Sequence, residues 1–94
     1  MEPNNLLNKL KGVERFVNTY SIGKEDLVKE IPINISVEIL KSVVTPKEGD
    51  DLLYMGYILD EKQLHQLSVI LGLTIVPRFK LYYYVLECVG TYDW

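Results

Sequence analysis

The chain has 94 residues, of which 48% are hydrophobic and 24% are charged, and its formal net charge is −3 at pH 7. This size suits a single domain over residues 1–94, and the mild acidity favours a basic partner over nucleic acid. No apolar run approaches the roughly 20 residues of a membrane span, and the N-terminus lacks the apolar core of a secretory signal, so we expect a cytoplasmic protein. One cysteine, Cys88, excludes an internal disulfide.

Two interpretations stay open for residues 1–12. They could form a short helix that ends at Gly12, with Leu6, Leu7 and Leu10 on one side, or a loose N-terminal arm.

Residues 13–33 predict a β-hairpin. Alternation from Val13 to Ile22 is typical of a strand, and the residues from Gly23 to Asp26 supply a turn. A second alternating run follows, in which Pro32 lacks an N–H donor and so favours a sheet edge or the end of the strand.

Two helices are predicted in the middle of the chain. Ser36 can cap the first, which spans about two to three turns and ends before Pro46. Asp60 and Gln63 have the spacing of a capping box for the second, and Gly72 marks its end.

The last element, Leu81–Val89, reads LYYYVLECV and predicts a central strand. The expected fold is therefore α+β: an antiparallel-rich sheet of three or four strands with two helices packed on one face, in the order β-β-α-α-β. We expect the helix-free face to carry Val17, Thr19, Val28 and alternate residues of the last strand, with tyrosines partly exposed.

The sequence offers little material for catalysis. His65 has no partner motif, and Cys88 lies in an apolar strand. There is no phosphate-binding glycine loop and no metal-ligand spacing. We therefore expect no enzyme activity, no catalytic residues, no cofactor and no metal.

The most informative stretch is the long connection PKEGDDLLYMGY at residues 46–57, together with the helix start after it. Its acidic residues could simply solvate a loop and cap a helix. The alternative is a negative surface with aromatic anchors that binds a basic protein. The candidate partner-binding residues are Glu48, Asp50, Asp51, Tyr54, Tyr57, Asp60 and Glu61.

The tyrosines at residues 82–84 raise the possibility of base stacking on single-stranded nucleic acid. Only Arg78 and Lys80 accompany them, so core packing with a protein-binding or dimer-forming face is favoured.

Three segments, VERFVNTYSIGKEDLVKEIPI, DDLLYMGYILDEKQLHQL and FKLYYYVLEC, resemble small bacterial domains of polymorphic toxin loci, among them immunity proteins of contact-dependent growth inhibition systems. The likeness spans residues 13–89. It implies a monomer that binds a cognate toxin one to one and blocks it, most often a nuclease such as an RNase with a basic active site. No membrane or nucleic-acid partner is implied. The alternative is a non-enzymatic structural or regulatory module that self-associates through the tyrosine face.

Overall fold

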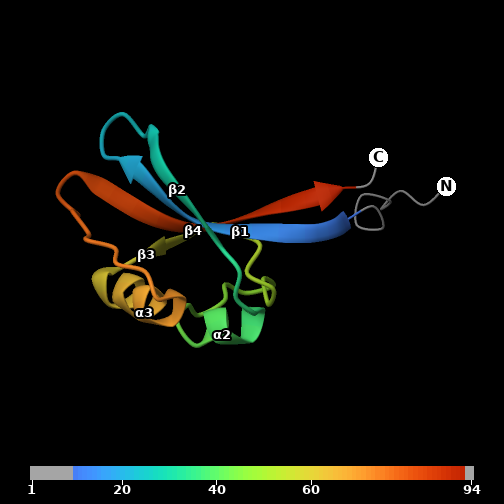
Figure 1. The fold of residues 1–94 in the computed structure, drawn as a ribbon. Helices are drawn as coiled ribbons and strands as arrows, with labels where there is room; N and C mark the ends of the chain where they lie inside the picture. The colour runs from blue at the N-terminus through green and yellow to red at the C-terminus, as the bar shows by residue number, and fades with distance from the viewer. Residues whose placement is uncertain (1–9, 93–94) are drawn as a thin grey trace.

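The computed structural model describes the backbone of residues 10–92 and the side chains of residues 13–90 (Figure 1). Four antiparallel strands form one sheet in the order β2-β1-β4-β3, and both helices lie on the same side of it. This confirms the predicted α+β fold. The elements in chain order are β1 (Leu10–Ser21), β2 (Leu27–Ile33), α2 (Val37–Lys41), β3 (Tyr57–Leu59), α3 (Glu61–Leu71) and β4 (Tyr82–Tyr92).

The long strands β1 and β4 form the centre of the sheet. They pair from Leu10 opposite Tyr92 to Ser21 opposite Tyr82, with an irregularity near Gly12. The prediction that Gly12 ends a helix is therefore wrong, because residues 10–12 belong to a strand; the rest of that N-terminal prediction, residues 1–9, lies outside the described residues. The predicted hairpin is present, since β2 pairs with β1 through a register shift between Thr19 and Tyr20.

Strand β3 was missing from the predicted order of elements. It has only three residues, which pair with Tyr84–Leu86 of β4. So short a run inside an acidic connection gives no visible alternation, and the pairing with β4 is what makes it a strand. The irregular connection before it therefore ends at Gly56.

The helix ends follow the predicted local chemistry. Ser36 accepts a hydrogen bond from the backbone N–H of Ile39 at the start of α2, and Asp60 with Gln63 forms a capping box on α3. Gly72 closes α3 with φ at 66°, in the left-handed region that glycine adopts readily. The first helix is shorter than predicted, since α2 has five residues and turns follow it.

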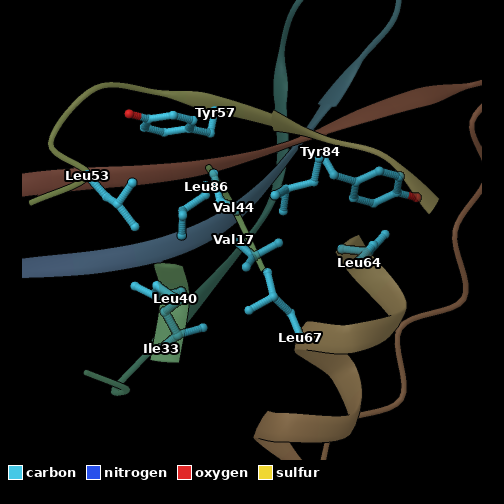
Figure 2. Packing of buried hydrophobic residues seen from close by; sticks show 11 residues of the cluster. Val17, Ile33, Leu40, Val44, Leu53, Tyr57, Leu64, Leu67, Tyr84 and Leu86 are labelled. Carbon is cyan, nitrogen blue, oxygen red and sulfur yellow. The ribbon is translucent and has the colours of Figure 1, made fainter. Parts of the chain in front are cut away.

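The helices cover the face that was predicted to be free of them. Val17 is fully buried, lies opposite Ile31 and Leu86, and points toward α2 and α3 (Figure 2). Both faces of β1 carry large apolar residues, so the alternation alone did not identify the inner face. The strand register identifies the inner face, because it places Val17 beside aliphatic residues of the neighbouring strands. The buried cluster comprises Val17, Ile33, Leu40, Val44, Leu53, Tyr57, Leu59, Leu64, Leu67, Tyr84 and Leu86.

Candidate protein interface

Asp50 lies inside the acidic loop and is only 6% exposed. Its carboxylate accepts hydrogen bonds from the backbone N–H groups of Tyr54 and Met55, at 2.8 and 3.0 Å, and from Tyr57 Oη at 2.5 Å. Tyr57 is also 6% exposed and accepts a hydrogen bond from the backbone N–H of Lys47. Both residues were predicted to contact a partner; the structure instead places their side chains in the interior, where they hold the loop together.

These contacts change the acidity of both groups. Burial acts to raise the pKa of Asp50, but the hydrogen bonds from Tyr57, Met55 and Tyr54 outweigh it and leave the pKa below its usual value. Burial and the hydrogen bond to Asp50 raise the pKa of Tyr57. The pair is therefore held as a carboxylate with a protonated phenol.

A hydrogen bond from β1 also holds the loop against the sheet. Arg15 of β1 is buried, and its Nη2 donates a hydrogen bond of 2.7 Å to the carbonyl of Leu52. The loop thus has one internal anchor at Asp50 and a second at Arg15. Its backbone is fixed by buried polar contacts, so substitutions at Asp50 test the fold rather than an interface.

The other five predicted interface residues are exposed, unlike these two. Glu48, Asp51 and Tyr54 are exposed on the loop. Asp60 is exposed, but its carboxylate accepts the backbone N–H of Gln63 at 2.8 Å. Glu61 borders a hollow of about 540 Å³ between α3 and the segment after it. The acidic loop therefore offers a smaller binding surface than the sequence suggested.

A second surface that combines carboxylates with apolar and aromatic groups lies on the side of the sheet away from the helices, and it is here called the open sheet face. Strand register assigns its side chains, and none of them between residues 13 and 90 is a lysine or an arginine. Ile58 and Val89 leave 73% and 54% of their surface exposed. The open sheet face comprises Glu14, Phe16, Asn18, Tyr20, Leu27, Glu30, Pro32, Ile58, Tyr83, Val85, Glu87 and Val89.

A polar cluster occupies the middle of the open sheet face. Asn18 Nδ2 donates to Glu87 Oε1 at 2.9 Å, and Tyr20 Oη donates to the same oxygen. The rings of Tyr20 and Tyr83 stack with centroids 5.4 Å apart. Asn18 is 5% exposed, and its Oδ1 is buried without a hydrogen-bond donor. The sequence contained a signal for this cluster, since Glu87 interrupts an otherwise apolar strand.

The hydrogen bond to Glu87 changes the acidity of Tyr20. Its hydrogen bond to the carboxylate, aided by burial, raises the pKa of Tyr20 above the ordinary value near 10. The unfolded chain thus loses this proton first, so the stabilisation is present below about pH 10 and is lost as the pH rises through the folded pKa. We expect the tyrosinate absorbance of Glu87→Gln to rise at lower pH than that of the native protein, with Tyr20→Phe identifying the contribution of Tyr20. Coincident curves for Glu87→Gln and the native protein would contradict this.

The remaining candidate groups are dispersed. His65 is exposed on α3, as predicted. Cys88 is half-buried, and burial raises the pKa of its thiol. Among the described residues, no three His, Cys, Asp or Glu side chains lie close enough together to hold a metal ion. No helix within residues 10–92 is both long and apolar enough to cross a membrane.

Fold and surface together define a small α+β domain that presents an acidic and aromatic sheet face. The chain belongs to the family described as Domain of unknown function (DUF7683), whose profile matches residues 14–87. No curated protein and no solved structure matches the chain.

Proposed function

We propose that this domain is a cytoplasmic immunity protein that binds a cognate toxin domain, an RNase or another nuclease, and neutralises it without catalysis. The supporting observation is the open sheet face. It combines three glutamates with the exposed side chains of Ile58 and Val89 and with half-buried aromatic rings, and its strands place no lysine or arginine on this face between residues 13 and 90. Carboxylates steer a basic partner, and rings supply contact area once solvent is excluded.

The mechanism follows from the chemistry of a nuclease active site. Such a site presents cations to the phosphates of its substrate, and a protein surface bearing carboxylates competes for the same cations. The exposed loop residues Glu48, Asp51 and Tyr54 can extend the contact beyond the sheet. Inhibition then requires occupancy alone, with one domain on each toxin.

The test is a titration of the domain into the nuclease encoded beside its gene. We expect the cleavage rate to fall linearly to an end point at one domain per nuclease, with weaker binding at high salt because charge attraction is screened. A domain that binds no neighbouring gene product, or that binds without lowering cleavage, would contradict the proposal.

Exposed Ile58 and Val89 favour a second candidate, a structural or regulatory module that self-associates through the same face. Two copies packed face to face would bring glutamates against glutamates, which opposes this assembly. Sedimentation over a range of concentrations distinguishes the two candidates. A concentration-independent monomer counts against self-association, and a dimer counts against the inhibitor.

A further inference from the structure

We propose that the open sheet face carries an arginine-binding site at Glu87, which receives a guanidinium from a basic protein partner. This inference deepens the proposed function, and it rests on that function only for the identity of the partner. The starting point is the carboxylate. Its two hydrogen bonds come from the neutral groups of Asn18 and Tyr20, and both fall on Oε1. Oε2 accepts no hydrogen bond from residues 13–90, so it is the oxygen that can pair with a donor from outside.

Asn18 provides an independent indication of a ligand. Its amide is nine-tenths buried and fixed by donation to Glu87, while Oδ1 has no donor among the described residues. A buried acceptor without a partner destabilises the fold, because the atom has lost its hydrogen bond to water. Oδ1 is closed to solvent, so a ligand reaches it only when the Asn18 amide turns outward. A group that pairs with Glu87 and carries additional N–H donors would then satisfy this acceptor, which gives the site a chemical preference beyond charge.

Arginine fits these conditions better than lysine. A guanidinium has five N–H donors in a rigid plane, so it can serve two neighbouring acceptors, and it stacks favourably on aromatic rings. The stacked pair of Tyr20 and Tyr83 lies beside Glu87 on the same face. An ammonium is a compact point charge, and it would not gain from a flat ring surface in the same way.

Charge complementarity selects the partner. Glu14 and Glu30 add negative charge on either side of the cluster, and the strands place no lysine or arginine on this face between residues 13 and 90. The glutamates repel both a nucleic-acid backbone and a second copy of the same face. A protein segment that presents arginine is therefore the occupant to which the chemistry points.

The site is tested without the toxin by titrating short blocked peptides into ¹⁵N-labelled protein. The probe is Gly-Arg-Gly, and the matched peptides carry lysine or citrulline, the second being an isostere of arginine without its charge. We expect the Arg peptide to shift the side-chain amide signals of Asn18, with a dissociation constant in the millimolar range, as suits one ion pair with stacking. Glu87→Gln should abolish the shift, because the charge that binds the guanidinium is lost. The amide oxygen of the new side chain can still accept from Asn18 and Tyr20, so the local structure is kept. Glu38→Gln, an exposed change on the helix side, should leave it intact.

Equal shifts with citrulline, no shift with arginine, or a shift that survives Glu87→Gln would each overturn the arginine site. In the nuclease complex, Glu87→Gln is expected to weaken binding at least about 30-fold, as for a desolvated charge pair. Glu30→Gln, which removes an exposed charge from the same face, should cost less than about five-fold. If a toxin binds Glu87→Gln as tightly as the native protein, the arginine site is wrong and the proposed function as an inhibitor is unaffected. If the Arg peptide binds but no toxin does, the arginine site is supported and the proposed function is contradicted.

Discussion

Replacing Asp50 with alanine is expected to lower the melting temperature by several degrees and to release the loop at residues 46–56. The change removes an acceptor that holds the backbone N–H groups of Tyr54 and Met55 and the hydroxyl of Tyr57. The hydrogen bond from the Tyr57 hydroxyl is buried and the two from the N–H groups are partly buried, so leaving these donors unpaired costs part or all of their desolvation. Tyr57 belongs to the buried cluster and begins β3, so the damage should extend to the edge of the sheet.

Two variants make this result specific. Asp51→Ala removes the neighbouring exposed carboxylate and should change the melting temperature little. Asp50→Asn keeps the shape but places an N–H₂ group where an acceptor is required, so it should behave more like Asp50→Ala than like Asp51→Ala. Thermal unfolding followed by circular dichroism and hydrogen exchange at Tyr54 and Met55 measure the effect. Similar melting of the Asp50 and Asp51 variants would show that the buried carboxylate does not hold the loop.

The same contacts predict a dependence on acid. Because the folded pKa of Asp50 lies below its ordinary value, the unfolded chain takes up the proton first. The stabilisation is complete above about pH 4 and is lost as the pH falls through the folded pKa. Urea unfolding of the native protein should therefore show a steeper loss of stability in acid than unfolding of Asp50→Ala.

The sequence predicted those parts of the fold that depend on local chemistry. Ser36, the pair of Asp60 with Gln63, and Gly72 each act on backbone groups within a few residues, so their spacing is enough to locate helix ends. Alternation located β1 and β2, and the run at residues 81–89, rich in tyrosine and valine, located β4. Strand β3 was not predicted because β4, with which it pairs, lies far along the chain.

The site was harder to predict because burial and facing depend on distant contacts. A carboxylate in a loop is usually exposed, so Asp50 and Tyr57 were interpreted as a surface, although the fold turns them inward. The acidic and aromatic combination itself does occur, but on the open sheet face. That face is formed by residues of β1, β2 and β4, so it can be predicted only when the strand register is known. The register brings Asn18 and Tyr20 of β1 to Glu87 of β4.

Truncation of Leu67 to alanine is expected to lower the free energy of unfolding by about 3 kcal/mol, within the range for buried leucines. Leu67 is fully buried and points from α3 toward Val17 beneath the sheet (Figure 2). For a domain of this size the loss corresponds to roughly 12–24 °C in melting temperature. Val69→Ala on the exposed side of the same helix should change stability by less than about 0.5 kcal/mol. Urea unfolding of both variants gives the comparison, and equal stabilities would mean that α3 does not seal the core.

This truncation also separates folding from binding. Leu67 packs on the helix side of the sheet, whereas Glu87 faces the opposite side. We therefore expect the side-chain amide signals of Asn18 in Leu67→Ala, studied well below its melting temperature, to shift with the arginine peptide as they do in the native protein. Glu87→Gln should show the converse, with nearly native unfolding and no response to the peptide. If Leu67→Ala lost the peptide response while still folded, the open sheet face would depend on the packing beneath it, and binding at Glu87 could not be assigned to that face alone.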